Sequence, residues 1–175
     1  SHPSVTRGAE LAGASLLEVS DLGRLQRGLE ETDGALVIVT GVTSEQVVMP
    51  EADLVEALRM IRRAGRVSLV DDAYGARVRT VLFGQPTARS AGADLAITSN
   101  QKAGLTGPRA GLLVGEPSLV QRVLSVATEY GQEARAPIAL GVLRSLERYE
   151  PARLLADAAV GKELYAAMSA VFGAK

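Results

Sequence analysis

The sequence predicts an α/β fold with a mostly parallel sheet, one antiparallel strand and a helical C-terminal portion. Short apolar runs alternate with amphipathic stretches, a pattern that is typical of βαβ units. Residues 35–39, for example, are β-prone and apolar on both faces, as a buried parallel strand requires. With 175 residues and 47% hydrophobic content, the chain can bury a core without disulfides or a structural metal.

The next elements complete a βαβ unit. Residues 51–63 predict a helix, because their apolar side chains share one face and acids precede arginines along it. Residues 67–70 form the following strand, which ends at Asp71 and Asp72. The two strands are expected to run parallel, joined by a right-handed crossover.

Two further strands are predicted at residues 95–98 and 111–114. Because the Gly- and Pro-rich segment 99–110 is barely long enough for a crossover helix, we expect the last strand to be antiparallel. Asp21 is expected to cap a helix. We also expect a helix at residues 5–12, a short strand at 15–19 and the helix that Asp21 caps at 21–29. Three C-terminal helices are expected at residues 117–129, 137–148 and 151–171.

The composition excludes several kinds of chemistry. The chain has no Cys, which excludes a thiol nucleophile and a thiolate zinc site. The single His, His2, argues against a multi-histidine metal site and a Ser-His-Asp triad, and no metal site is predicted. A net charge of −1 gives no electrostatic argument for nucleic acid or an anionic membrane. Without a membrane span or a signal-peptide layout, a cytoplasmic location is expected. Any catalysis therefore depends on lysine, carboxylates, hydroxyls or a cofactor.

Polar residues follow the predicted strands, at the sheet edge where open α/β folds bind ligands. The second and third strands are followed by Asp71, Asp72, Ala73, Tyr74 and Gly75, and by Ser99, Asn100, Gln101 and Lys102. Neither a dinucleotide fingerprint nor a P-loop is present. Lys102 is one of only three lysines, and a lysine amine at a strand end is suited to bind a cofactor aldehyde.

These motifs, in this order, resemble the core of fold-type I pyridoxal-phosphate enzymes, whose large domain has the aspartate aminotransferase-like fold. They are most similar to the selenocysteine-synthase-like group, including its archaeal members, and residues 1–14 share this similarity. The resemblance implies pyridoxal 5′-phosphate as cofactor, with Lys102 forming a Schiff base and acting as general base when free. It implies β-replacement or β-elimination on a seryl-type amino acid, and leaves open whether that amino acid is linked to tRNA.

The resemblance assigns the ring of the cofactor to residues that follow the second strand. Asp71 would pair with the pyridine nitrogen, which withdraws electrons only while it is protonated. The small side chain of Ala73 would let the ring lie flat against the strand. Tyr74 would donate a hydrogen bond to the phenolic oxygen of the ring, with a packing role as its alternative. Asp72 is expected to be a loop acid or a helix cap.

The remaining cofactor contacts concern the phosphate and the second face of the ring. Ser99 matches a phosphate ligand, and Arg109 would supply the cation that phosphate binding needs. Arg109 could equally serve packing or a neighbouring subunit. His2 would approach the ring or the substrate, unless Ser-His is a remnant of tag removal.

The resemblance also predicts the domain organisation. Residues 1–136 correspond to the central part of a cofactor-binding large domain, and residues 137–175 lead toward a smaller C-terminal domain. The upstream phosphate cup and that smaller domain are expected to be absent from the chain, and a homodimer is expected. The alternatives are a pyridoxal-phosphate lyase or aminotransferase of other specificity, a non-catalytic interaction module, and an α/β enzyme that uses Asp71 and Asp72 as metal or acid/base carboxylates.

Overall fold

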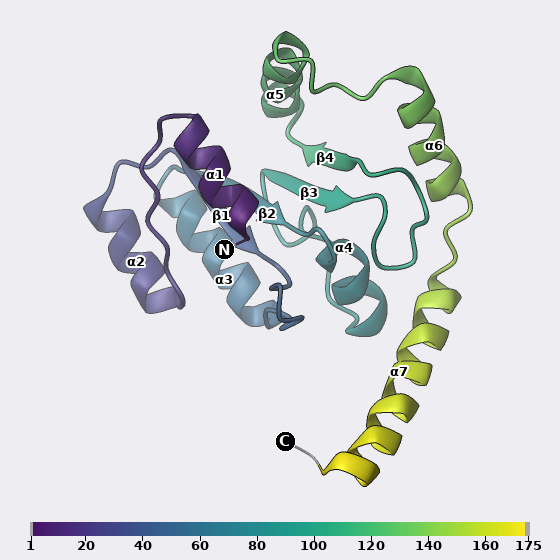
Figure 1. Cartoon of the computed structure of the whole chain (residues 1–175). Coiled ribbons are helices and arrows are strands. Elements are labelled where there is room, and N and C mark those ends of the chain that lie inside the picture. Colours follow the sequence, from purple (N-terminus) through teal and green to yellow (C-terminus); the bar gives the residue numbers. More distant parts are fainter. Residues whose placement is uncertain (1, 174–175) are drawn as a thin grey trace.

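The computed structural model of the chain describes residues 2–173. Its centre is a four-stranded sheet in the order β1-β2-β3-β4 (Figure 1). The strands are β1 Leu36–Thr40, β2 Val67–Asp71, β3 Leu95–Ser99 and β4 Gly111–Gly115. β1, β2 and β3 are parallel, and β4 pairs antiparallel with β3. The predicted mixed sheet, including its antiparallel strand, is therefore confirmed.

The expected helices occur in the expected order, and a short helical pair at residues 75–82 occurs in addition to them. They are α1 Pro3–Leu11, α2 Leu22–Glu31, α3 Glu51–Arg63, α4 Gly75–Arg77, the π-helix η1 Val78–Leu82, α5 Pro117–Glu129, α6 Ala136–Glu147 and α7 Pro151–Phe172. Asp21 caps α2, since its side chain accepts a hydrogen bond from the backbone N–H of Arg24 at 2.8 Å. Prolines occupy the first turns of α5, α6 and α7, where their missing N–H has no helical partner to lose.

One local expectation was wrong, and one helical segment was not predicted. The segment at residues 15–19, which was expected to be a strand, is irregular. It lies beside α2, where Leu17 approaches Gly28, and it does not pair with a strand of the sheet. The short helical pair α4–η1, residues 75–82, was not predicted. It covers too few residues for a helical period to be visible, and it begins at a glycine.

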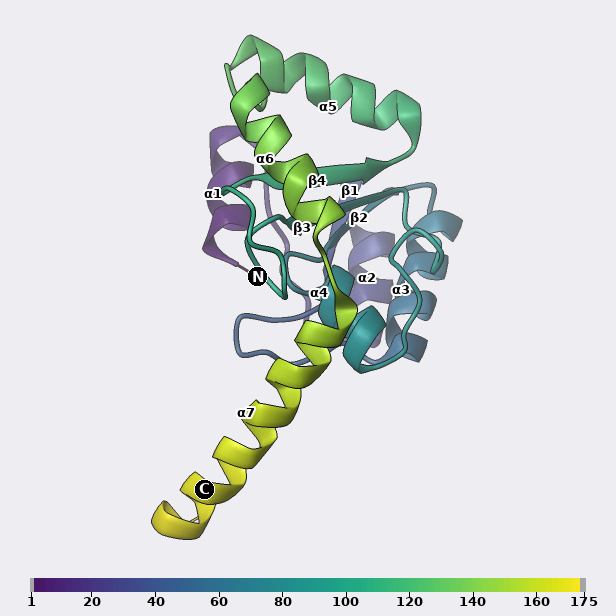
Figure 2. The same ribbon diagram turned by 90° about the vertical axis from the view of Figure 1, so that its right-hand side faces the viewer.

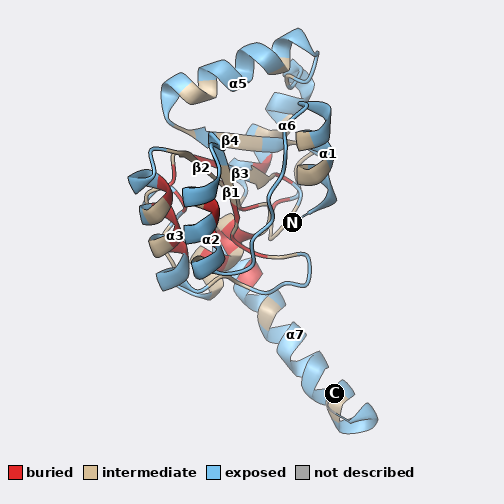
Figure 3. Ribbon diagram, turned by 90° about the vertical axis from the view of Figure 1, so that its left-hand side faces the viewer, coloured by how far each residue is buried: buried red, intermediate tan, exposed pale blue. Residues whose placement is uncertain are grey.

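The two faces of the sheet have different surroundings. Val39, Val70 and Ala96 pack against one face of α3, and this cluster is the main buried core (Figure 3). Because side chains alternate along a strand, their neighbours Ile38 and Leu69 point to the opposite face. That second face is the one that carries the candidate site.

The C-terminal helix α7 extends away from the sheet (Figures 1 and 2). It contacts η1, and Leu154 is its buried residue among those described. Within residues 2–173, none of the helices combines the length and apolar character needed to cross a membrane. The division into residues 1–136 and 137–175 stays a prediction.

Candidate active site

A cleft of about 570 Å³ opens on the second face of the sheet, at the carboxyl ends of β2 and β3. It is lined by all the predicted site residues except Tyr74, namely His2, Asp71, Ala73, Ser99, Lys102 and Arg109. Three apolar side chains from successive strands, Ile38, Leu69 and Ile97, also line it. The structure thus brings together residues from the start of the chain and from two strand ends.

The consecutive acids Asp71 and Asp72 have opposite surroundings. Asp71 ends β2 on the cleft side, where its Oδ1 accepts a hydrogen bond from the backbone N–H of Ala73 at 3.3 Å. Asp72 is 1% exposed and forms an ion pair with the fully buried Arg79, whose Nε lies 3.0 Å from Oδ1. The expected loop or capping role of Asp72 is therefore replaced by a buried ion pair.

Asp72 is also tightly enclosed by backbone. A Cβ added at Gly41 or Gly75 would lie 2.2 or 2.0 Å from its Oδ1, so both positions need glycine. The backbone N–H of Asp72 donates to the carbonyl of Ile97 at 2.9 Å, which joins the ends of β2 and β3. This packing fixes the chain on either side of Asp71.

Lys102 lies in the turn that follows β3. Its Nζ is 4.2 Å from the centroid of the Tyr74 ring, which places a cation over an aromatic face. The two residues after it have positive φ angles, +50° at Ala103 and +87° at Gly104. Among the described residues Lys102 forms no ion pair, so no carboxylate competes for its amine.

Arg77 forms hydrogen bonds to the backbone of this turn, and it was not among the predicted site residues. Its guanidinium donates to three backbone carbonyls, those of Ser99 at 2.6 Å, Lys102 at 3.1 Å and Ala103 at 3.2 Å. Arginines are mostly exposed, and backbone acceptors leave no mark in a sequence. The only available signal was a pair of arginines, Arg77 and Arg79, two residues apart just after a strand end.

Helix α6 and the segment after it support the other side of the turn. The backbone N–H of Thr106 donates to the Ser145 hydroxyl at 3.1 Å, and the Tyr149 ring lies against Gly104. Burial raises the pKa of Tyr149, and the nearby Arg77 charge opposes this only in part. The lysine turn is therefore packed between α4 and α6.

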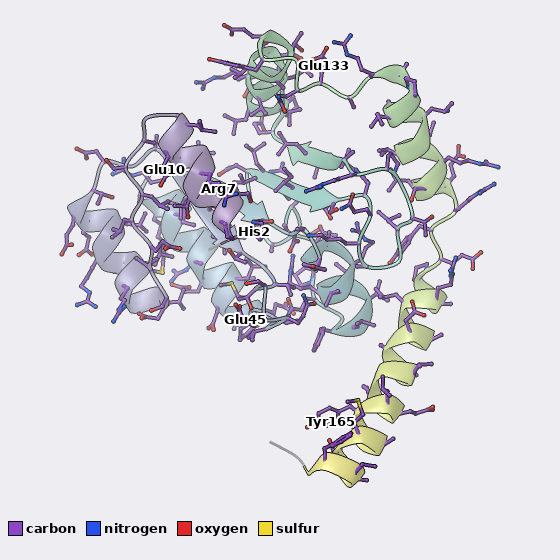
Figure 4. All side chains as sticks on the ribbon, in the orientation of Figure 1. His2, Arg7, Glu10, Glu45, Glu133 and Tyr165 are labelled. Atoms are coloured by element: carbon purple, nitrogen blue, oxygen red, sulfur yellow. The ribbon has the colours of Figure 1, made fainter. Side chains whose placement is uncertain are left out.

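The remaining predicted residues are His2 and Arg109, which are exposed, and Ser99, which is partly buried. Figure 4 shows His2 at the start of α1, where its Nδ1 accepts a hydrogen bond from the backbone N–H of Ser4 at 3.2 Å. Ser99 accepts a hydrogen bond from the Gln101 N–H at 3.4 Å, and its hydroxyl proton remains available for a ligand. Arg109 is exposed at the cleft. All three can reach an anion or a substrate that enters from solvent.

No group of three or more His, Cys, Asp or Glu side chains within residues 2–173 is arranged to hold a metal ion. Asp71 and Asp72, which the metal alternative needs together, face opposite sides of the sheet end, and Asp72 is paired with Arg79. The arrangement therefore favours a cofactor site that uses Lys102 and Asp71 over a two-carboxylate metal site.

Solved structures share this fold. The chain superposes with a TM-score of 0.75 on the pyridoxal-5′-phosphate-dependent protein YhfS from Escherichia coli, at 24% identity over 97% of this chain and 45% of that one. It superposes with a TM-score of 0.64 on cystathionine gamma synthase from Xanthomonas oryzae pv. oryzae, at 19% identity over 81% of this chain and 36% of that one. The fold is thus that of pyridoxal-phosphate-dependent transferases.

The sequence comparisons define the family. Residues 1–162 match the aminotransferase class I and II family, and the chain belongs to it. A UPF0425 pyridoxal phosphate-dependent protein from Methanothermobacter thermautotrophicus is 44% identical over 88% of this chain and 40% of its own length. Another, from Methanosphaera stadtmanae, is 35% identical over 94% and 42%. The chain spans about two fifths of these curated relatives.

Proposed function

We propose that the protein is a pyridoxal-phosphate-dependent enzyme that binds its cofactor covalently through Lys102. The main observation behind this proposal is that Lys102 and Asp71 line the same cleft. The two groups come from different strand ends, and pyridoxal-phosphate chemistry uses both an amine and a carboxylate. Membership of a family that uses this cofactor supports the same assignment.

The residues that line the cleft fit the cofactor. The apolar side chains Ile38, Leu69 and Ile97 suit a planar aromatic ring, and the small Ala73 leaves room beside them. Asp71 would hold the ring nitrogen. Tyr74 is outside the cleft lining and lies against the Lys102 amine, from where it would hold the phenolic oxygen. Ser99 and Arg109 would bind the phosphate, while His2 would contact the ring or the substrate from the start of α1.

When bound, pyridoxal phosphate withdraws electrons from the α-carbon of an amino acid. Asp71 would accept a hydrogen bond from the ring nitrogen and so favour its protonated form. The Lys102 amine would take a proton from the α-carbon of the bound amino acid. The Tyr74 ring beneath that amine keeps it beside the cleft.

For the reaction we propose β-replacement or β-elimination on a seryl-type amino acid, on the basis of the motif resemblance to selenocysteine-synthase-like enzymes. An enzyme of this kind breaks the α-C–H bond and the bond from the β-carbon to its substituent. A homodimer and a cytoplasmic location stay predictions, and a tRNA link of the substrate stays an open alternative.

The substrate proposal is tested by supplying the cofactor-loaded intact protein with O-phosphoserine. The expected result is release of inorganic phosphate, with pyruvate and ammonia formed when no nucleophile is added. Amino-group transfer to a 2-oxo acid without phosphate release would contradict it and favour an aminotransferase. Absence of both reactions over a panel of amino acids would favour the non-catalytic alternative.

Replacing Asp71 with asparagine tests the electron-withdrawing arrangement. The Asp71→Asn protein is expected to retain cofactor on Lys102 but to turn over on the order of a hundredfold more slowly, because an amide does not stabilise a protonated ring nitrogen as a carboxylate does. Cofactor content and turnover are measured on the same sample. Turnover equal to that of the wild type would show that Asp71 does not serve the ring.

A further inference from the structure

Arg77 is a buried arginine without a carboxylate partner among the described residues. It is 8% exposed, whereas the neighbouring buried arginine, Arg79, is paired with Asp72. Burial lowers the pKa of Arg77, with smaller opposing effects from Tyr149 and Asp72. Because desolvating a guanidinium is costly, a buried one needs hydrogen-bond acceptors, and here backbone carbonyls accept from the Nε and Nη2 atoms of Arg77.

These carbonyls belong to the last residue of β3 and to the turn after it. Ser99 precedes the turn, and Ala103 follows Lys102 with a φ of +50°, in the left-handed region that favours glycine. The Lys102 carbonyl accepts from Arg77 and also from the backbone N–H of Leu105 at 3.2 Å. The Arg77 guanidinium therefore binds backbone carbonyls before and after Lys102, in a turn that contains the positive φ angle of Ala103.

The same helical turn that carries Arg77 also carries the ring beneath the lysine amine. The backbone N–H of Arg77 donates to the Tyr74 carbonyl at 3.3 Å, so the two side chains start from one short rigid segment. Tyr74 contacts the end of the Lys102 side chain, and Arg77 contacts its backbone. Tyr74 and Arg77 therefore restrict both the amine and the backbone of Lys102.

We propose that Arg77 is a positioning residue that fixes the Lys102 turn so that the lysine amine meets the cofactor aldehyde in the cleft. This inference rests on the proposed function of Lys102. Without the guanidinium, the three carbonyls lose their shared donor and the turn samples other conformations. Since small misplacements of a reacting group slow reactions strongly, covalent capture of pyridoxal phosphate is expected to slow by about tenfold or more.

The experiment compares Arg77→Gln, Arg77→Lys and a control, Arg66→Gln, in the intact protein. Arg66 is a partly buried arginine that also donates to a backbone carbonyl, that of Thr32 at 2.8 Å, but it lies away from the cleft. Three quantities are measured. They are the rate of borohydride-trappable capture of pyridoxal phosphate, the affinity for pyridoxamine phosphate, which cannot form the covalent bond, and hydrogen exchange at the Leu105 and Gly107 amides without cofactor.

For Arg77→Gln we expect capture to slow by about tenfold, faster exchange in the turn, and pyridoxamine phosphate affinity within about twofold of the wild type. Arg77→Lys should recover part of the capture rate, because an ammonium can still donate to the carbonyls. Equal capture rates for Arg77→Gln and Arg66→Gln would overturn the inference. If Arg77→Gln does not fold, a wild-type rate and wild-type turn exchange in Arg77→Lys would overturn it as well, since one ammonium cannot reproduce the planar guanidinium.

Failure of the underlying function gives a different result. If wild-type protein forms the trapped adduct at a residue other than Lys102, the proposed function is wrong, whatever the Arg77 variants show. If the adduct is at Lys102 and its formation is independent of Arg77, only the positioning role is wrong.

Discussion

Replacing Lys102 with alanine is expected to abolish covalent incorporation of pyridoxal 5′-phosphate, at least a hundredfold below the wild type. Among the described residues, no other lysine lines the cleft. Lys162 lies on α7, and Lys175 falls outside the described residues. The loss is measured as the visible absorbance of the protein after cofactor addition and gel filtration. Because Lys102 is only partly buried in a turn, the folded state should remain intact.

The matched control for this variant is Lys162→Ala, which removes an exposed lysine on α7. It should incorporate cofactor as the wild type does. Equal absorbance in Lys102→Ala and the wild type would mean that another amine binds the aldehyde, and the site would then have to be reassigned.

Replacing Asp72 with asparagine is expected to lower the free energy of unfolding by about 3–5 kcal/mol, because it leaves the guanidinium of Arg79 buried without its counter-charge. Arg79 also donates to Gln85 and to the Pro86 carbonyl, so it cannot turn outward without breaking further hydrogen bonds. Urea unfolding followed by circular dichroism measures the change.

Two comparisons make the Asp72 result specific. The Glu56→Gln variant breaks an exposed ion pair with Arg59 and should leave stability almost unchanged. The double variant Asp72→Leu with Arg79→Met removes both charges and should recover much of the loss. A small effect of Asp72→Asn, similar to that of Glu56→Gln, would show that the buried pair contributes little.

The βαβ core could be predicted because its signals are local. In α3 the apolar residues, the early acids and the final arginines all indicate the same helix, and the predicted range 51–63 matches the observed one. The antiparallel β4 followed from the shortness of segment 99–110. The irregular conformation of residues 15–19 could not be predicted. A strand forms only where a partner strand is available, and the sequence does not show whether residues 15–19 have one.

The candidate site was predictable where its chemistry depends on residue type. Lys102 and Asp71 stand out because an amine and a carboxylate follow neighbouring strands, and the fold brings such ends together. The different surroundings of Asp71 and Asp72 follow from side-chain alternation, but the partner of Asp72 came from the unpredicted η1. Arg77 was missed because its acceptors are backbone carbonyls, which every residue has.

The central claim is that Lys102 is the residue that binds pyridoxal phosphate. It is tested most directly by incubating the intact wild-type protein with the cofactor, reducing with borohydride, and mapping the modified peptide by mass spectrometry. We predict a single modification at Lys102, close to one per chain. Modification at Lys162 or Lys175, or low labelling spread over all lysines, would contradict the claim.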